Sequence, residues 1–572
     1  MPVCNRIHII IKPDKLMIPL SQKSFLHHVL SVLSLSTLAT VSPIHPLEAA
    51  EKISFYYTPL GFSIRISSLE RFANDGIIDK NLEFYLNLPG LNDEEITKFR
   101  EALNQSIDID PVLLYRVLNT EIGEEILTLM GQVINIQGGG NGKYAIRAAF
   151  VQAAFEPEGW TLLNFFKKLP VNMQIDLQNV LKLAQQIELA VQATEYATEV
   201  MIDLAGKEAQ NNSSINFAEL PNIRQPGPFQ VQYQRWQLTD DSRKRSFYVD
   251  VYQPQQRRQG KTPVVIISHG LSSNPDGFKT LAKHLASYGY LIAAPQHIGS
   301  DTQQTKDLIE GYSLKLFDND EFINRPLDIS YVIDELERRN DEEFAGQLAL
   351  DQVGVFGHSF GGYTALALAG GTIDFGNLAR QCDLHSRLPN TALLLQCRAL
   401  SLPEKDYDFR DSRVKAVFVS NPVNRAVFGE KGLSSIEIPV FVGAGNYDPA
   451  TPFALEQLVS FPWLGSQEKY LFMMEGQAHV NFAELDSGIT EVIERVDALT
   501  LPPPQLLEDY SDTMTLSFFE VYLAQNPDFE PYLTTAYPEY LGESEDFKAY
   551  LITQKSVPAL NELIKRFRRQ KG

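Results

Sequence analysis

Cysteine is scarce in this chain, which has only three among its 572 residues. Neither Cys382 nor Cys397 is accompanied by a set of further ligands at the spacing of a zinc site. A nucleotide-binding loop is also missing, because the glycine-rich stretch at residues 138–144 (GGGNGKY) lacks the first glycine and the final Ser or Thr of the phosphate-loop pattern. The sequence therefore predicts no metal and no cofactor.

Positive charge is in short supply as well. The chain has 50 Lys and Arg against 71 Asp and Glu, a formal net charge of -21. Binding to a phosphate backbone requires clustered basic side chains, whereas the basic runs here are short, as at residues 243–245 and 565–569, and are typical of solvated surface. The composition argues against nucleic acid as a partner.

Long apolar runs are missing except near the N-terminus. Residues 25–41 (FLHHVLSVLSLSTLATV) follow a basic segment and precede Ala49 and Ala50, an order typical of a secretory signal. Two histidines and several serines make the run less apolar than a membrane span. We expect residues 1–50 to be a leader, with Met1 or Met17 as its start, and the protein to be periplasmic or secreted. Membrane anchoring through residues 25–41 is the alternative.

Cys4 lies within this leader, which leaves two cysteines in the exported protein. Cys382 and Cys397 are 15 residues apart, and an even pair of cysteines in an exported protein is a candidate disulfide. Closing a loop of that length is worth about 3 kcal/mol in the chain-entropy treatment. Two unpaired, buried thiols are the alternative.

The spacing of apolar residues along the chain changes after about residue 205. Residues 51–205 open with strand-like alternation and continue with helical periodicity, including a capping box formed by Asn92 and Glu95, which predicts a smaller, mainly helical N-terminal domain. Residues 206–227 are polar and contain prolines, as in a linker. From 228 to 572 apolar strands alternate with helices, which predicts an α/β domain with a doubly wound, mostly parallel sheet. The candidate strands lie within residues 246–254, 263–270, 290–297, 353–359, 414–422, 438–445 and 469–476.

One of these strands runs directly into Gly357-His358-Ser359-Phe360-Gly361, and a helix of small residues follows. The pattern is typical of a nucleophile elbow, a tight turn that lifts a serine hydroxyl clear of the sheet and leaves no room for side chains at the two glycines. The alternative is a glycine-rich turn with an incidental serine. The context of strand, turn and helix favours Ser359 as a nucleophile.

A serine hydroxyl needs a histidine to take its proton and a carboxylate to orient that histidine. Asp448 follows one predicted strand, and His479 follows the next. The order Ser, acid, His along the chain is the one used by doubly wound hydrolases. An Asx turn at Asp448 and a surface histidine at 479 are the alternatives.

Two backbone N–H groups are needed to stabilise the oxyanion of an acyl-transfer reaction. The residue after the nucleophile, Phe360, supplies the first candidate, and Leu271, in the turn His269-Gly270-Leu271 after another predicted strand, supplies the second. His269 and His358 flank the predicted site, and we expect them to have packing or supporting roles.

These motifs together resemble the plasma-type platelet-activating factor acetylhydrolase branch of the α/β-hydrolases, which is also labelled dienelactone-hydrolase-like. The resemblance covers about residues 228–500 and implies an α/β-hydrolase fold, with Ser359, Asp448 and His479 as the triad. The N-terminal segment is similar to a domain of unknown function attached to such hydrolases in cyanobacterial proteins. True dienelactone hydrolases have a cysteine where this chain has Ser359, which argues against that activity.

The sequence therefore predicts a serine ester hydrolase acting on a small-molecule ester, with a lipid or phospholipid as a candidate substrate. Thioester hydrolysis and acyl transfer use the same triad and are alternatives, as is a non-catalytic protein that binds a membrane or a partner through the helical domain. Residues 370–409 separate the elbow helix from the next strand and are long enough to form a lid. An ordered surface excursion without a gating role is the alternative.

Overall fold

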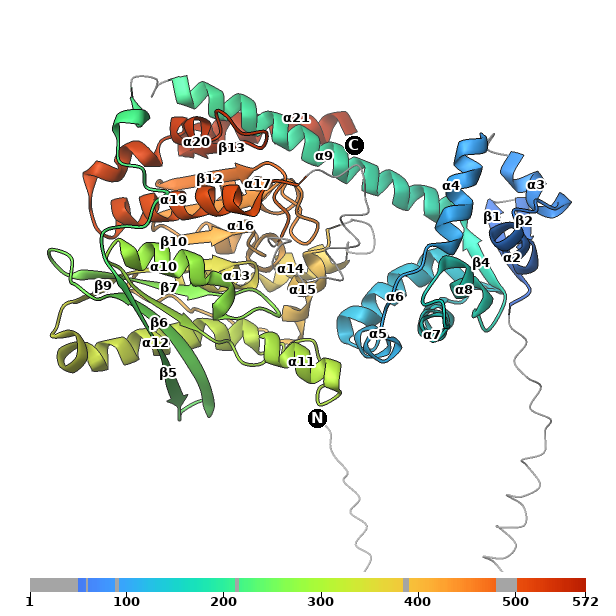
Figure 1. The fold of residues 1–572 in the computed structure, drawn as a ribbon, viewed down its shortest axis with the longest axis horizontal. Helices are drawn as coiled ribbons and strands as arrows, with labels where there is room; N and C mark the ends of the chain where they lie inside the picture. Colours follow the sequence, from blue (N-terminus) through green and yellow to red (C-terminus); the bar gives the residue numbers. More distant parts are fainter. Residues whose placement is uncertain are drawn as a thin grey trace, which may run out of the picture.

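The computed structural model describes residues 50–57, 60–87, 92–210, 215–383, 390–479 and 501–571. The predicted leader, apart from Ala50, and Cys4 lie outside the described residues. Within the described ranges, no helix combines the length and the apolar character that crossing a bilayer requires. Two sheets organise the structure, a four-stranded one in a smaller domain and a nine-stranded one in a larger domain (Figure 1).

The larger sheet has the strand order β13-β12-β11-β10-β9-β7-β8-β6-β5. Its six central strands, β7 to β12, pair in parallel. Strand β13 at one edge and strands β6 and β5 at the other pair antiparallel. The predicted strands are present as β6 to β12, which confirms the expected mostly parallel α/β architecture. The bounds are β5 Val231–Asp240, β6 Arg245–Pro254, β7 Thr262–Ser268, β8 Leu291–Pro295, β9 Leu348–His358, β10 Val414–Ser420, β11 Val440–Gly445, β12 Lys469–Met474 and β13 Ala549–Thr553.

Helices cover both faces of this sheet, as its alternating buried side chains require. On β7, Val264 and Ile266 join the core under one set of helices, and Val265 and Ile267 join the core on the opposite face. A strand buried on both faces must be apolar at every position, which explains the continuous apolar runs in the sequence. The first face carries α12 (Glu321–Phe344), α13 (Phe360–Leu368), α16 (Arg425–Leu433) and α17 (Gln457–Ser460), and the second carries α10 (Lys279–Ser287), α19 (Pro504–Tyr522) and α20 (Ala536–Leu541).

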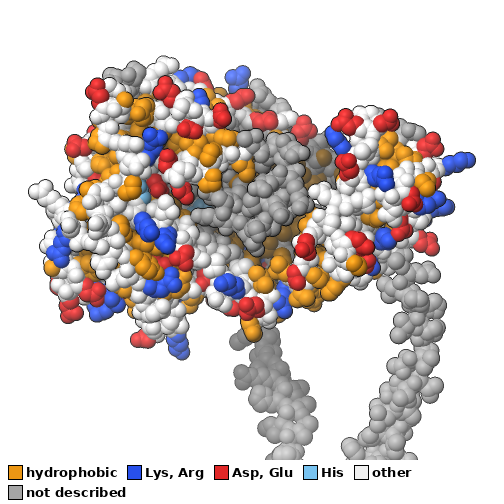
Figure 2. Space-filling view, in the orientation of Figure 1, with side chains coloured by type: hydrophobic (Ala, Val, Ile, Leu, Met, Phe, Trp, Pro, Cys, Tyr) orange, Lys and Arg blue, Asp and Glu red, His pale blue; other side chains and the backbone are white. Residues whose placement is uncertain are grey.

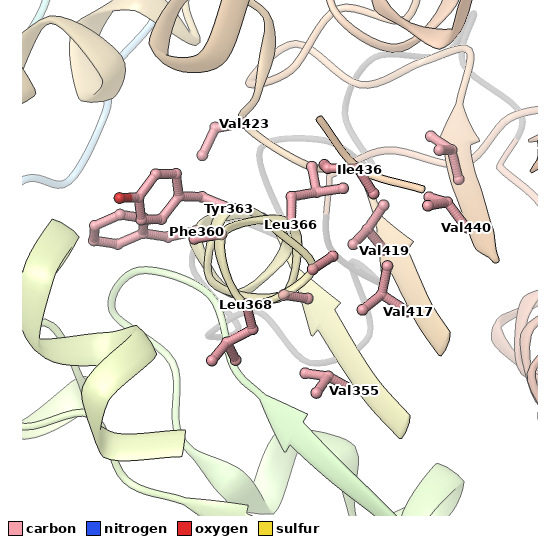
Figure 3. Close-up of a cluster of buried hydrophobic side chains, with 14 of the residues drawn as sticks. Val355, Phe360, Tyr363, Leu366, Leu368, Val417, Val419, Val423, Ile436 and Val440 are labelled. Atoms are coloured by element: carbon pink, nitrogen blue, oxygen red, sulfur yellow. The ribbon is translucent and has the colours of Figure 1, made fainter. Parts of the chain in front are cut away.

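Helix α13, which follows Ser359, is buried along its whole length. Figure 3 shows it surrounded by apolar side chains, with Leu366 facing the β10 residues Val417 and Val419 and with Phe360 and Tyr363 on its other side. An all-round apolar helix is stable only inside a core. Its packing therefore holds the turn at Ser359 rigidly.

The smaller domain combines a sheet of order β2-β1-β4-β3 with short helices. Its core includes Ile53, Phe72, Leu103 and Ile146, all nearly inaccessible to solvent. The predicted capping box begins α4, where the Asn92 side chain accepts from the Glu95 N–H at 3.0 Å and is thus confirmed. The bounds are β1 Lys52–Tyr57, β2 Leu60–Arg65, α2 Ile66–Asp75, α3 Lys80–Asn87, α4 Asp93–Asn104, α5 Pro111–Leu118, α6 Glu121–Val133, β3 Ile134–Ile136, α7 Lys143–Ala154, α8 Leu162–Lys167 and β4 Met173–Asp176.

A single long helix, α9 (Leu177–Ala209), joins the two domains. It leaves the smaller domain directly after β4 and runs along the larger one (Figure 1). Its C-terminal half buries Ala197, Met201 and Ala205 completely against the larger domain. The domain boundaries at 205 and 228 stay a prediction, and α9 itself runs across the first of them.

The smaller domain also contacts the segment predicted as a lid. Arg398 forms ion pairs with Glu125 and Glu121 of α6, the latter at 3.7 Å. The Arg116 guanidinium of α5 donates to the carbonyl of Ile309 in α11 (Thr302–Glu310).

On the surface seen in Figure 2, Lys and Arg side chains are scattered among acidic ones.

Residues 370–383 and 390–409 of this segment are described, and 384–389 are not. The segment forms α14 (Phe375–Asp383), α15 (Leu393–Gln396) and a 3-10 turn at Cys397–Ser401. Gln396 is fully buried and accepts from the N–H groups of Ala426 and Val427 at 2.8 and 3.0 Å. This packing favours the ordered excursion over a lid, and gating stays a prediction.

The predicted disulfide is present, since Cys382 and Cys397 are bonded with their Cα atoms 5.7 Å apart. It links α14 to the turn that carries Arg398, the residue that contacts the smaller domain. Its presence is consistent with an exported protein.

We expect removal of both cysteines, as Cys382→Ala with Cys397→Ala, to lower the free energy of unfolding by about 3 kcal/mol, because the cross-link restricts the unfolded chain. Denaturant titration of the oxidised proteins measures this difference. Reductant should lower the wild-type midpoint and leave the double variant unchanged. An equal response of both proteins to reductant would assign the stabilisation to another part of the chain.

Candidate active site

Ser359 lies in the turn between the end of β9 and the start of α13, in a backbone conformation that non-glycine residues rarely adopt. Its φ is 55° and its ψ is -113°. A Cβ added at Gly361 would overlap the Ser268 carbonyl oxygen, and one added at Gly357 would overlap the Gly361 carbonyl oxygen. The turn therefore has the geometry of a nucleophile elbow, and strain of this kind is stored at functional sites.

The structure brings together the three residues that the sequence predicts as a triad. His479 Nε2 lies 2.8 Å from Ser359 Oγ, and His479 Nδ1 lies 2.8 Å from Asp448 Oδ2. Asp448 follows β11 and His479 follows β12, so all three residues lie beyond the carboxyl ends of parallel strands of the same sheet. In this arrangement Nδ1–H donates to the carboxylate, which leaves Nε2 free to accept the serine proton.

Asp448 is buried and densely hydrogen-bonded. Its carboxylate accepts from the Thr451 hydroxyl at 2.6 Å, from the Thr451 and Ala450 N–H groups at 2.9 and 2.7 Å, and from the Asn421 amide. Burial raises the pKa of the carboxyl, but the His479 imidazole and the hydrogen bonds from His479 and Thr451 outweigh it and hold the pKa well below its ordinary value. Asp448 is therefore ionised and able to orient His479.

The two predicted oxyanion donors both lie close to Ser359. Phe360 begins α13, and Leu271 lines the same cavity as Ser359 and His479. A Cβ added at Gly270 would lie 3.3 Å from the Ser359 Cβ, which places this loop directly against the nucleophile. Within the described ranges, neither the Leu271 N–H nor the Phe360 N–H donates a hydrogen bond, so both are free for an oxyanion.

The flanking histidines support the site without titrating near neutral pH. His358 Nε2–H donates to the His479 carbonyl at 2.7 Å, and burial lowers the pKa of His358 to about 4. His269 Nδ1–H donates to the Gly270 carbonyl at 2.8 Å, while its Nε2 accepts from the His297 N–H at 3.0 Å. Both rings bind backbone next to a predicted site residue, and their supporting roles stay a prediction.

Arg325 of α12 is a supporting residue that the sequence analysis missed. It is completely buried, and its guanidinium donates to the carbonyls of His269 at 2.6 Å and Gly270 at 3.2 Å. It also lies over the Phe360 ring at 4.4 Å. Arg325 thereby connects the two predicted oxyanion donors, and nothing in the helical pattern around it distinguishes it from a surface arginine.

Asn421 and Thr451 were missed as well, although a local signal exists for each. Asn421 directly follows β10, at the same edge of the sheet as the triad, and has a φ of 46°. Thr451 is three residues after Asp448, the spacing at which a hydroxyl can reach back to an aspartate at the start of a turn.

A cavity of about 200 Å³ opens beside Ser359 and His479. Its apolar part includes Phe278 and Leu281, and its acidic part includes Glu508 and Asp512 of α19. Burial, and then the charges of Glu508 and Asp509, raise the pKa of Asp512 to about 8. The cavity therefore presents both apolar and acidic groups to a substrate.

Comparison with known protein families agrees with this geometry. The family described as "Alpha/beta hydrolase of unknown function (DUF1400)" matches residues 49–176, and the chlorophyllase family matches residues 220–381, which include the elbow. The larger domain has the α/β-hydrolase fold. The α/β-hydrolase assignment rests on these two matches together with the strand order and the elbow. No curated protein matches the chain.

At the elbow, Gly361→Ala is expected to lower the free energy of unfolding by at least about 2 kcal/mol, because the added methyl group overlaps backbone that cannot move aside. Gly376→Ala in α14 is the matched control, since its Cβ would meet nothing closer than 3.4 Å. Thermal unfolding of both variants measures the difference. Equal melting temperatures would contradict the close packing of the elbow.

Asp512 generates a pH-dependent prediction for stability. The unfolded carboxyl loses its proton near its ordinary pKa of 3.8, whereas the folded one keeps it until about pH 8. The contribution of Asp512 to stability therefore falls as pH rises from about 4 to 8 and is lowest above that range. Asp512→Asn should raise the melting temperature at pH 9 relative to wild type, with a gain that shrinks toward pH 4.

The exposed Asp546 offers the control, and Asp546→Asn should give no such trend. Melting temperatures of wild type, Asp512→Asn and Asp546→Asn across this pH range measure the trend. A constant difference between Asp512→Asn and wild type would show that Asp512 does not titrate in this window.

Proposed function

We propose that the protein is a serine hydrolase that cleaves a carboxylic ester. The observation that carries the proposal is the continuous pair of hydrogen bonds from Ser359 through His479 to Asp448, each 2.8 Å long. The strained turn at Ser359 and the two free N–H groups beside it support the same chemistry.

In the proposed reaction, Ser359 Oγ attacks the acyl carbon while His479 Nε2 accepts its proton. The carbonyl oxygen becomes an oxyanion and binds the N–H groups of Leu271 and Phe360. His479 then donates the proton to the alcohol oxygen, the ester bond breaks, and an acyl-serine remains. A water molecule, deprotonated by His479, hydrolyses the acyl-serine and restores the serine. Asp448 orients the imidazole and stabilises its charged form in both halves.

We propose an ester with an apolar part as the substrate class. Phe278, Leu281 and Leu507 supply apolar lining next to Ser359, and the resemblance to platelet-activating factor acetylhydrolases favours a lipid or phospholipid ester. The match to the chlorophyllase family makes chlorophyll a further ester to include in any substrate screen.

Hydrolysis of p-nitrophenyl esters of increasing chain length, short-chain phospholipids and chlorophyll by the purified protein tests this proposal. Ser359→Ala should lower kcat/KM by roughly four orders of magnitude or more with little change in melting temperature. His479→Ala should have a similar effect, and the double variant should be little worse than either single one, because the two residues act as a unit.

Ser434→Ala removes an exposed serine hydroxyl elsewhere in the chain and should leave the activity unchanged. A fluorophosphonate probe should label wild type and Ser434→Ala and should not label Ser359→Ala. Activity of Ser359→Ala above about a tenth of wild type would refute the mechanism, since loss of a triad serine costs far more. Absence of both labelling and hydrolysis in wild type would favour a non-catalytic binding protein.

A further inference from the structure

A second cavity lies away from the triad, between the helix that joins the domains and the C-terminal helix. Its walls come from α9, from residues 454–459 including α17, and from α21 (Val557–Lys571), which lie together in Figure 1. The cavity measures about 250 Å³, and no residue that lines it lines the cavity at Ser359. We call it the α9–α21 groove.

The lining of the groove is mostly hydrocarbon. Leu458 and Leu560 form buried parts of it, and Leu189 on α9 is 37% exposed at the groove. Tyr196 of α9 stacks on Phe567 of α21 with ring centroids 5.1 Å apart, which holds the two helices together beside the opening. An apolar cavity of this size is smaller than the roughly 300–1,000 Å³ of most small-molecule sites, so it suits one hydrocarbon chain.

Two arginines border this apolar groove. Arg425 begins α16, and Arg568 lies near the end of α21. Arg425 donates from one terminal nitrogen to the Leu455 carbonyl at 3.2 Å, and its Nε is buried without a hydrogen-bond partner. Within the part of the chain that the structure describes, neither arginine forms an ion pair with a carboxylate.

Glu456, a carboxyl group that acts on Arg425, already has other hydrogen-bond donors. Glu456 is fully buried and accepts from Asn390, Gln396 and the N–H of Arg425, at 2.7 to 3.1 Å. Burial, together with the positive charge of Arg568, lowers the pKa of Arg425, and Glu456 opposes the shift only in part. The buried guanidinium of Arg425 therefore has a charge that Glu456 offsets only in part, and the exposed Arg568 adds a second positive charge at the same groove. A bound anion would stabilise this arrangement.

The apolar groove suits one hydrocarbon chain, and the two guanidinium groups beside it form no ion pair with a carboxylate of the described chain. From this combination, we infer that the α9–α21 groove binds a free fatty acid. The hydrocarbon chain lies along α9 and α21, and the carboxylate accepts from Arg425 and Arg568. A guanidinium is suited to such a contact because it presents paired donors to a carboxylate. The site is separate from the proposed reaction and does not depend on it.

Isothermal titration calorimetry of the full chain tests the inference, with laurate as the anionic probe and dodecanol as the neutral probe of the same length. Ser359→Ala serves as the background in all variants, so that hydrolysis plays no part. Laurate should bind at one site per chain and more tightly than dodecanol. Arg425→Gln and Arg568→Gln should each raise the Kd of laurate by about tenfold or more, the usual effect of losing a charge-assisted hydrogen bond. The Kd of dodecanol should change by less than about twofold, because it carries no charge to lose.

Arg566→Gln is the matched control, since Arg566 is exposed on the same helix and does not line the groove. Ala193→Phe, which fills the groove, should abolish binding of both probes. Arg568 is exposed, so its substitution keeps the test valid even where Arg425→Gln fails to fold.

Three outcomes would overturn the inference. They are no laurate binding, equal loss of laurate and dodecanol in the arginine variants, or unchanged binding in Ala193→Phe. Binding to vesicles of anionic phospholipid in the absence of laurate binding would overturn it as well and would assign the arginines to a membrane surface.

Discussion

The close approach of backbone at Gly357, Gly361 and Ser268 is the constraint on which the site depends. With no Cβ at either glycine, β9 can turn directly into α13 and leave Ser359 in a strained conformation above the sheet. The cost of that strain is met by α13, which is buried on all sides between the sheet and α12. Packing far from the hydroxyl thus determines where the hydroxyl lies.

Three buried ionisable side chains near the active-site cavity show how hydrogen-bond partners determine whether a buried group stays ionised. Asp448 loses solvent but gains hydrogen bonds from Thr451, Asn421 and His479, so it stays ionised. Asp512 loses solvent without a comparable set of donors in the described chain, so its pKa rises. Arg325 resembles Asp448 in having partners but has the opposite charge. Its buried guanidinium donates to two backbone carbonyls and fixes the loop that carries Leu271. One rule of electrostatics accounts for all three.

Helix α9 serves the two domains in different ways along its length. Its last turns are buried in the larger domain, whereas Leu181, Ile187 and Val191 before them are about half exposed. The α9 residues that line the α9–α21 groove, among them Leu189 and Ala193, lie between these two parts of the helix or close to them in sequence. The helix is therefore both a connection between the domains and one wall of the proposed fatty acid site.

Much of the larger domain could be predicted from the chain alone because the signals are local. Apolar runs predicted β6 to β12, and the order of Ser359, Asp448 and His479 predicted three residues that the structure places within hydrogen-bond reach. The edge strands β5 and β13 were missed. Strand β5 is half exposed and rich in polar residues, and β13 is only five residues long and enters the sheet after a long helical stretch.

The sequence by itself predicted strands β6 to β12 and a candidate triad, since the spacing of glycines and apolar residues acts over a few positions along the chain. Only the tertiary structure decided which distant groups meet. It placed Arg325 against the loop that carries Leu271, 54 residues away in the sequence, paired Asn421 with Asp448, and brought Arg425 and Arg568 to the same apolar groove. Such contacts depend on how whole helices pack against a sheet, and no local pattern of residues encodes that packing.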